Sequence, residues 1–323
     1  MSPRAAISGT RSGISLDCAI LEDDSATVQE IMRKVGKIAH SINLKFKMNG
    51  RAKPVEVSKI RPRKLFEKND ERVFVQELKA SHHGAFPDLV FLDNNLGGDQ
   101  GTGLHAINEI SKAKLPLDSI LYSNVQNVVE PNQTNPYGRT WSSNYSDLED
   151  VLESAITKFY LTWTNPEHIR GLILSRSADL DAAWNNLISS LLKLSNTKRP
   201  YFVEFALTRD GLDISRKAEN ASKVSKTMEI KRYVNTGWST KIGNFKERTK
   251  KHTSTRNDFA HNLINGIGND GRIRIRTKKT TTSRVTSRDG YGREEVKKFF
   301  VDVTTLINEM NDASSKIRAG QAP

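Results

Sequence analysis

Two short apolar segments of the chain end directly in acidic residues. Residues 18–21 read Cys-Ala-Ile-Leu and are followed by Glu-Asp-Asp at 22–24, while residues 89–92 read Leu-Val-Phe-Leu and are followed by Asp93. Apolar runs of this length are typical of strands buried on both faces of a parallel sheet. Because the carboxyl ends of parallel strands share one edge, we expect these acidic side chains to lie together there.

Segments with helical spacing of apolar residues alternate with the strands of this first part. The helix after the first strand covers residues 25–42, with Ser25 as its expected N-cap. The other expected elements are strands near 54–60 and 119–122, helices over 68–81, 102–112 and 146–161, and a loop over 124–143. This alternation predicts an α/β domain over residues 17–161, a doubly wound parallel sheet, after a disordered lead-in at residues 1–16.

The pattern changes after a linker expected at residues 162–166. Long segments with a helical apolar stripe follow, and residues 271–277 alternate strictly between polar and apolar, as in a strand of a hairpin. The expected helices cover 167–194, parts of 215–235, 238–250, 255–265 and 293–316. Residues 167–318 are therefore predicted to form a mainly α-helical domain with a small β-hairpin.

The acidic residues at the strand ends have two readings. An aspartate after a strand can simply cap the next helix. Clustered carboxylates otherwise repel one another unless a divalent cation lies between them, and Mg²⁺ suits such oxygen ligands and can bring a phosphoryl donor. Residue spacing alone leaves both readings open.

Three segments of the first half resemble the receiver domain of two-component response regulators, over roughly residues 17–160. They read CAILEDDSATVQEIM, DLVFLDNNLGGDQGTGLHAI and SILYSN. The resemblance implies that Glu22 and Asp23 form the acidic pair and that Asp93 accepts the phosphoryl group. It also implies that Asn95 offers its backbone carbonyl to Mg²⁺, that Ser123 is the switch residue, and that Gly101 is the loop glycine.

The sequence departs from the receiver pattern at one position. Receivers carry a lysine at the end of the last strand, but no lysine lies between Lys114 and Lys158, where Arg139 is the single cation. An arginine can pair with a phosphoryl oxygen, yet its geometry and hydration differ from those of lysine. The resemblance therefore implies phosphorylation of Asp93 at a site that lacks the usual lysine.

The second half contains an arginine and a histidine five residues apart, Arg256 and His261, with Asn257 beside the arginine. On one helix the two side chains lie about 140° apart, so they share a site only near a helix end or a groove. A surface arginine and a partly buried histidine without a catalytic role would give the same sequence pattern. The catalytic reading is metal-independent RNA cleavage, in which histidine moves a proton and arginine clamps the phosphate.

This segment resembles the HEPN family of helical domains, whose motif is an arginine followed after four to six residues by a histidine. The resemblance covers about residues 167–318 and implies that Arg256, Asn257 and His261 are catalytic, with no metal cofactor. Many members are ribonucleases that dimerise around the motif and act in toxin–antitoxin and antiviral systems, while others are binding or structural modules. A homodimer would bring two arginine–histidine pairs together.

The net charge of +13 belongs entirely to the second half of the chain. Residues 1–163 hold 20 basic and 20 acidic residues, and residues 164–323 hold 30 and 17. The segment 272–288 has seven cations and no acid, which favours contact with RNA phosphates, although a solvated excursion is the alternative. The predicted nucleic-acid-binding residues are Arg272, Arg274, Arg276, Lys278, Lys279, Arg284 and Arg288.

The remaining composition narrows the classes of protein. No run of about 18 apolar residues predicts a membrane span, the first residues are too polar for a secretion signal, and Cys18 alone excludes an intramolecular disulfide. Together with the two resemblances, this leads us to expect a cytoplasmic, signal-regulated endoribonuclease of bacterial stress or phage defence, with RNA, a histidine kinase or a defence-system protein as partners. The alternatives are a non-catalytic regulator that dimerises or binds nucleic acid, and a transcriptional response regulator.

Overall fold

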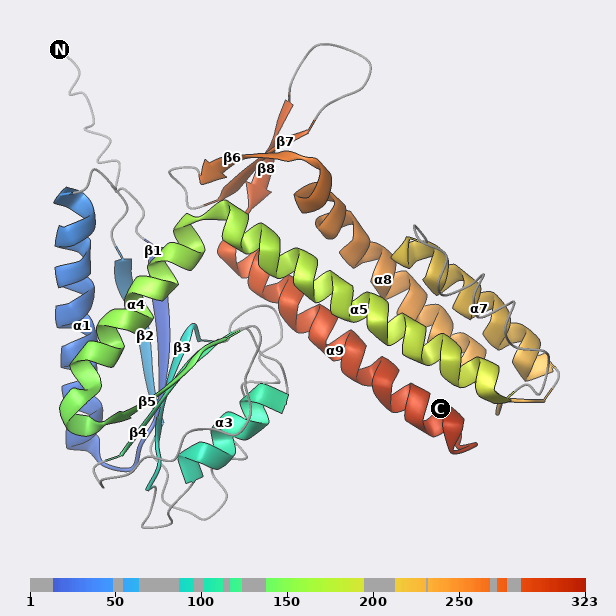
Figure 1. Ribbon diagram of the computed structural model, residues 1–323, viewed down its shortest axis with the longest axis horizontal. Helices are drawn as coiled ribbons and strands as arrows, with labels where there is room; N and C mark the ends of the chain where they lie inside the picture. The colour runs from blue at the N-terminus through green and yellow to red at the C-terminus, as the bar shows by residue number, and fades with distance from the viewer. Residues whose placement is uncertain are drawn as a thin grey trace, which may run out of the picture. The chain divides into compact units, whose positions relative to one another are not determined.

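The two apolar segments that end in acidic residues belong to neighbouring strands, β1 and β3, inside a five-stranded parallel sheet (Figure 1). The order is β2-β1-β3-β4-β5, which is the flavodoxin-like order of doubly wound α/β folds. The strands are β1 Ile14–Leu21, β2 Val55–Arg63, β3 Leu89–Asp93, β4 Asp118–Ser123 and β5 Thr140–Asn144. The structure describes residues 14–48, 55–63, 87–95, 102–112, 117–123, 138–194, 213–230, 232–267, 272–277 and 286–323.

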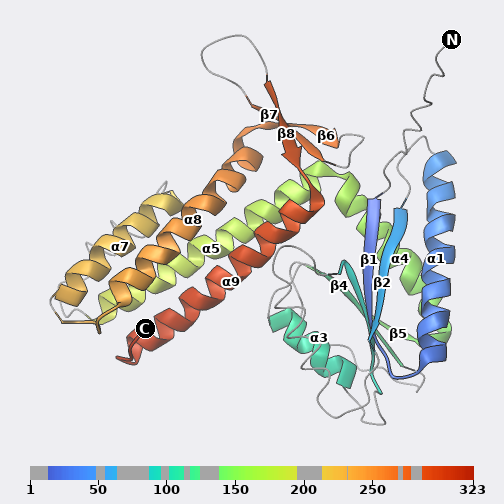
Figure 2. The same ribbon diagram turned by 180° about the vertical axis from the view of Figure 1, so that it is seen from behind.

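Helices cover both faces of this sheet, as both views show (Figures 1 and 2). α1 (Ser25–Met48) and α4 (Leu148–Thr164) pack on one face, and α3 (Thr102–Lys112) packs on the other. Alternate residues of each strand divide between the faces: Phe91 and Ile120 join the core under α1 and α4. The receiver-like, doubly wound α/β fold expected from the sequence is therefore confirmed.

Several expected boundaries in this part were wrong. Residues 14–16, expected to be disordered, begin β1, whereas residues 1–13 and the helix expected at 68–81 lie outside the described residues. The last strand, β5, occupies residues expected to be loop. Within the expected linker at 162–166, Asn165 alone separates α4 from α5.

The second half consists of long helices that run alongside one another (Figure 1). They are α5 Pro166–Leu194, α7 Ile214–Ile230, α8 Trp238–His261 and α9 Arg293–Arg318. Their core contains fully buried aromatic rings, and the Trp184 indole of α5 donates a 3.0 Å hydrogen bond to Thr249 of α8. The mainly helical architecture is confirmed, but the two helices expected at 238–250 and 255–265 are one continuous helix.

A small three-stranded sheet follows α8, in the order β6-β7-β8. Its strands are β6 Leu263–Ile267, β7 Ile273–Thr277 and β8 Thr286–Tyr291. The chain divides into two compact units, each built from three segments of the sequence. The first unit combines residues 1–169 with 264–274 and 287–298, and the second combines 170–263, 275–286 and 299–323.

Candidate functional site

The carboxylates at the ends of β1 and β3 form a compact acidic cluster. One oxygen from each of Glu22, Asp23 and Asp93 lies within 4.8 Å of the others. Glu22 is 3% exposed and Asp93 is 8% exposed, so little water screens their repulsion. Oxygen donors at this spacing suit a hard cation such as Mg²⁺, and the parallel pairing of β1 with β3 is what brings them together.

The third acidic residue after β1 has a different role. Asp24 accepts hydrogen bonds from the backbone N–H groups of Ala26 and Thr27 at 3.1 and 3.0 Å, and from the Thr27 hydroxyl at 2.7 Å. It is therefore the N-cap of α1, and the prediction that Ser25 is the cap was wrong. The capping role falls on Asp24 and leaves Glu22 and Asp23 to the cluster.

Burial dominates the electrostatics of the cluster. It raises the pKa of Glu22 from 4.5 to about 7, partly offset by a 2.6 Å hydrogen bond from the Tyr122 hydroxyl and by the backbone N–H of Asp24. Burial also raises the pKa of Asp93 from 3.8 to about 6, and the Asp23 charge adds to this. A bound cation would favour the ionised form of both carboxyls.

The residues that follow β3 link it to β4 and α3. The Asn95 side-chain amide donates a 2.7 Å hydrogen bond to the Ser123 hydroxyl, so these two predicted site residues are in contact. The side-chain oxygen of Asn94 accepts a 3.3 Å hydrogen bond from the backbone N–H of Leu104. Gly103 packs so closely that a Cβ there would lie 2.5 Å from the Asp93 backbone oxygen.

Sequence reasoning missed Gly103 and Tyr122, and it matched Gly101, which lies outside the described residues. A glycine in the first turn of a helix, after a strand that ends in a site residue, was the available signal for Gly103.

Arg139 cannot replace the missing lysine in this arrangement. It directly precedes β5, its N–H donates to Asp118 at 2.7 Å, and its guanidinium lies 5.1 Å from the centre of the Trp141 ring. Asp118 begins β4, whereas Ser123 ends it beside the acidic cluster, and this length of strand spans about 16 Å. The end of β5 instead carries Ser143 and Asn144, and Lys158 forms an ion pair with Asp118.

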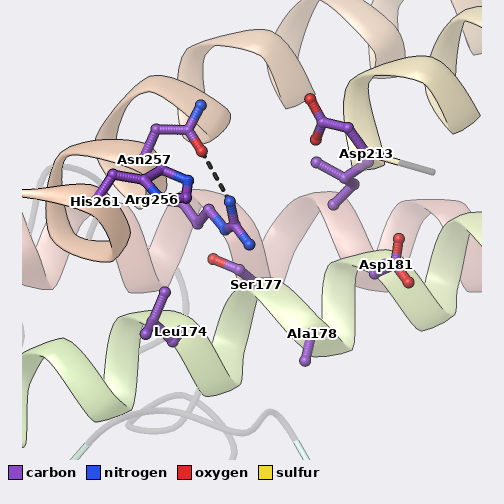
Figure 3. A pocket seen from close by; sticks show the side chains of 9 residues that line it. Leu174, Ser177, Ala178, Asp181, Asp213, Arg256, Asn257 and His261 are labelled. Carbon is purple, nitrogen blue, oxygen red and sulfur yellow. Dashed lines mark hydrogen bonds between the residues drawn. The ribbon is translucent and has the colours of Figure 1, made fainter. Parts of the chain in front are cut away.

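The predicted catalytic residues of the second unit line one pocket (Figure 3). Arg256, Asn257 and His261 lie in the last two turns of α8, and the Arg256 guanidinium donates a 2.9 Å hydrogen bond to the Asn257 side-chain oxygen. The cavity has a volume of about 690 Å³. Although Arg256 and His261 are five residues apart on α8, both line this pocket at the C-terminal end of the helix.

The remaining lining residues come from α5 and from the start of α7. They are Leu174, Ser177, Ala178, Asp181, Asp213 and Ile214. The end of α8 is fixed by Arg170 of α5, whose guanidinium donates to the Ala260 carbonyl at 2.9 Å. This contact satisfies one of the last-turn carbonyls that lack a partner inside the helix.

The basic segment after α8 is only partly described. Ile273 and Ile275 of β7 are 2% and 3% exposed, which confirms the alternation expected there. Arg272 donates to the Gly290 carbonyl at 2.6 Å and to Glu295 at 2.8 Å, so its charge is offset. Arg274, Arg276 and Arg288 lie on β7 and β8, while Lys278, Lys279 and Arg284 lie outside the described residues.

Two solved structures similar to this chain are response-regulator proteins. The N-terminal domain of a response regulator/sensory box/GGDEF three-domain protein from Carboxydothermus hydrogenoformans is 18% identical, with a TM-score of 0.25, over 44% of this chain and 92% of that chain. A two-component response regulator from Cytophaga hutchinsonii is 17% identical, with a TM-score of 0.26, over 44% of this chain and 98% of that chain. No protein-family model and no curated protein matches the sequence.

The strand order and the acidic edge by themselves define the first unit as a receiver-like α/β domain. Among the helices that the structure describes, none is both long enough and apolar enough to cross a membrane.

Proposed function

We propose that this protein is a signal-regulated endoribonuclease, in which the helical unit cleaves RNA without a metal and the receiver-like unit controls that activity. The observation that supports the proposal most directly is the pocket at the end of α8. It brings Arg256, Asn257 and His261 together in a cavity large enough for a nucleotide. Arg256 would bind the phosphate and His261 would transfer the proton.

In the proposed reaction, the ribose 2′-oxygen attacks the adjacent phosphorus while His261 takes the 2′-hydroxyl proton. The bond from phosphorus to the 5′-oxygen breaks, and that oxygen gains a proton, which leaves a 2′,3′-cyclic phosphate and a 5′-hydroxyl. Arg256 stabilises the charge that develops on the phosphate oxygens, and Asn257 orients the guanidinium. In a homodimer, a second His261 would supply the proton that the leaving oxygen needs.

The test is cleavage of a structured RNA by the full-length protein, with and without EDTA. We expect cleavage to survive EDTA and to fall at least about a hundredfold in Arg256→Ala and His261→Ala. Lys250→Ala is the matched control, because Lys250 is an exposed cation on the same helix, where it forms an ion pair with Glu247 away from the pocket residues. Cleavage that persists in both pocket variants would contradict the proposal.

For the receiver-like unit, we propose that Glu22, Asp23 and Asp93 hold Mg²⁺ and that Asp93 accepts a phosphoryl group. Their oxygen donors and mutual repulsion fit a divalent cation, which would supply charge stabilisation to the phosphoryl group. Incubation with Mg²⁺ and acetyl phosphate is expected to label the wild-type protein and Asp150→Ala, an exposed site on α4, but not Asp93→Ala. Labelling that persists without Asp93 would overturn this assignment.

A second candidate for the receiver-like unit is partner binding without phosphorylation. The observation that favours it is the end of β5, which carries Ser143 and Asn144 where the receiver pattern has a lysine. The same labelling experiment separates the two, because a cluster that binds Mg²⁺ but never acquires a label is a docking module. In that case a mass shift on mixing with a defence-system protein or kinase, rather than phosphorylation, would report its function.

A further inference from the structure

The pocket at the end of α8 has a second, acidic end that RNA cleavage does not explain. Figure 3 shows Asp181 and Asp213 on the side away from His261, with the Arg256 guanidinium extending between the two ends. Carboxylates repel phosphate, so this end is unsuited to the RNA backbone. A ligand that fills the whole pocket must be anionic near Arg256 and rich in N–H donors near the two aspartates.

Asp181 is held in a fixed position by an ion pair with its neighbour. Its Oδ2 forms a 2.7 Å ion pair with Lys217 of α7, whose side chain is 8% exposed. An ionised carboxylate accepts about four hydrogen bonds, so an ion pair through one oxygen leaves the group able to accept more. Since both partners lie on packed helices, Asp181 is pre-organised to accept hydrogen bonds from a ligand.

Asp213 adds a second negative charge at the start of α7. Its backbone oxygen accepts the N–H groups of Arg216 and Lys217 at 2.9 and 3.1 Å, and its Oδ1 accepts the N–H of Ser215 at a longer 3.4 Å. A metal is a poor explanation for the pair, because among the described residues a set of three candidate ligands occurs only at Glu22, Asp23 and Asp93. The acidic end is therefore suited to an organic group that is rich in N–H donors.

A nucleobase attached to the bound phosphate meets these requirements. Guanine presents two adjacent N–H donors, N1–H and the exocyclic amino group, on its Watson–Crick edge, which matches the paired oxygens of a carboxylate. Uracil presents one such donor, and the Watson–Crick edges of adenine and cytosine combine an amino group with an acceptor nitrogen that a carboxylate repels. Guanine is the base whose edge this site complements best.

We propose that Asp181, supported by Asp213, recognises a guanine next to the phosphate bound at Arg256, and so gives the pocket a preference for guanosine. This inference rests on the proposed ribonuclease function for its setting, but it concerns nucleotide binding, which is measurable without cleavage.

The test compares guanosine 3′-monophosphate with inosine 3′-monophosphate, which lacks the exocyclic amino group, by calorimetric titration of the full-length protein. We expect the guanosine nucleotide to bind about tenfold more tightly. Asp181→Asn replaces an accepting oxygen by a donor and is expected to abolish this preference, as is Asp181→Asn combined with Lys217→Met, which avoids leaving the lysine buried without its partner. Asp312→Asn, an exposed site on α9, is the control that keeps the preference.

The outcomes separate this inference from the proposed function. Equal affinity for the two nucleotides, or a preference that survives in both Asp181 variants, would overturn the inference even if RNA is cleaved. A guanosine preference that depends on Asp181, in a protein that cleaves no RNA, would support the inference and contradict the ribonuclease. Cleavage of oligonucleotides with a single guanosine, compared with single-inosine versions, is expected to follow the same order.

Discussion

Gly103 is the residue at which the acidic site depends most directly on the absence of a side chain. A Cβ there would lie 2.5 Å from the Asp93 backbone oxygen and 2.7 Å from Leu121 Cδ1. The backbone oxygen cannot turn away as a flexible side chain can, so either α3 or the end of β3 must move. The first turn of α3 therefore sets the position of Asp93.

We predict that Gly103→Ala lowers the free energy of unfolding by about 1 to 3 kcal/mol and weakens Mg²⁺ binding, because overpacking displaces Asp93. Gly36→Ala is the matched control: Gly36 lies within α1, nothing is within 4 Å of its added Cβ, and alanine should stabilise the helix by about 1 kcal/mol. Urea unfolding with and without Mg²⁺ measures both effects. Equal stability of the two variants would contradict the role given to Gly103.

Arg170 is predicted to position the end of α8 that carries the residues of the proposed ribonuclease site. Its hydrogen bond to the Ala260 carbonyl holds the residue before His261, so Arg170→Ala should lower kcat about tenfold or more with little change in KM or Tm. Arg170→Lys keeps a donor and should recover part of the rate. A loss confined to Tm, with kcat unchanged, would show that the contact only stabilises the fold.

At the scale of elements, the sequence predicts best where apolar side chains carry the periodicity. The strands that bear Glu22 and Asp93 are short apolar runs, so both the sheet and its acidic edge could be predicted. β5 was missed because it is an edge strand that reads Thr-Trp-Ser-Ser-Asn, with Trp141 as its single large apolar residue. Edge position and polar composition hide such a strand from hydrophobic patterning.

The continuity of α8 was missed for a related reason. Its buried stripe passes through Thr249 and Thr253, whose hydroxyls donate to the carbonyls of Phe245 and Thr249 at 2.9 and 3.0 Å. Threonines whose hydroxyls are hydrogen-bonded within the helix can be buried, but in the sequence they interrupt the pattern of apolar residues. Asp181 and Asp213 could not be predicted as pocket residues, because only the packing of α5 and α7 brings them to α8.

The first turns of α9, which belong to the first unit, contribute to a buried charge cluster within that unit. Arg293 and Lys297, one helical turn apart, both form ion pairs with Asp88, which also accepts the N–H of Asp17 at 2.9 Å. The side chains of Asp88 and Lys297 are 4% and 2% exposed. The guanidinium of Arg293 also lies 5.4 Å from the centre of the Phe159 ring.

We predict that Asp88→Asn destabilises the protein by about 3 to 5 kcal/mol, because it removes the charge of the carboxylate that pairs with both Arg293 and Lys297 in a buried cluster. Adding Lys297→Met should recover part of this loss, since it removes one of those cations. Asp312→Asn breaks an exposed pair with Lys316 and should barely change stability. Urea unfolding of the three variants tests this, and a loss for Asp88→Asn as small as that of the control would refute it.

At the scale of the whole molecule, the two units are expected to respond to pH in opposite directions. In the first unit, burial raises the pKa of Glu22 to about 7 and that of Asp93 to about 6. In the second unit, burial lowers the pKa of His252 from 6.5 to about 4, where its ring packs edge-on against Phe299 at 5.7 Å between ring centres. Each shift links folding to proton binding.

The sign differs because the folded state favours the neutral form in both units. For Glu22 and Asp93 the neutral form is protonated, so their contribution to stability is fully present below about pH 4 and is lost as pH rises through 6 to 7. For His252 the neutral form is unprotonated, so its contribution is present above pH 6.5 and is lost as pH falls toward 4. Acidification from pH 7.5 to 5 should thus strengthen one unit and weaken the other.

We predict that Mg²⁺ raises Tm more at pH 7.5 than at pH 5, because protons compete with the cation for Glu22 and Asp93 in the acidic range. Removing the ionisable groups should isolate each unit: Glu22→Gln with Asp93→Asn should abolish the Mg²⁺ effect, and His252→Gln should reduce the loss of stability below pH 6.5. Scanning calorimetry of these variants at several pH values measures both changes. An Mg²⁺ shift that is the same at both pH values, or that survives in the double variant, would show that the cation stabilises the protein somewhere other than the acidic cluster.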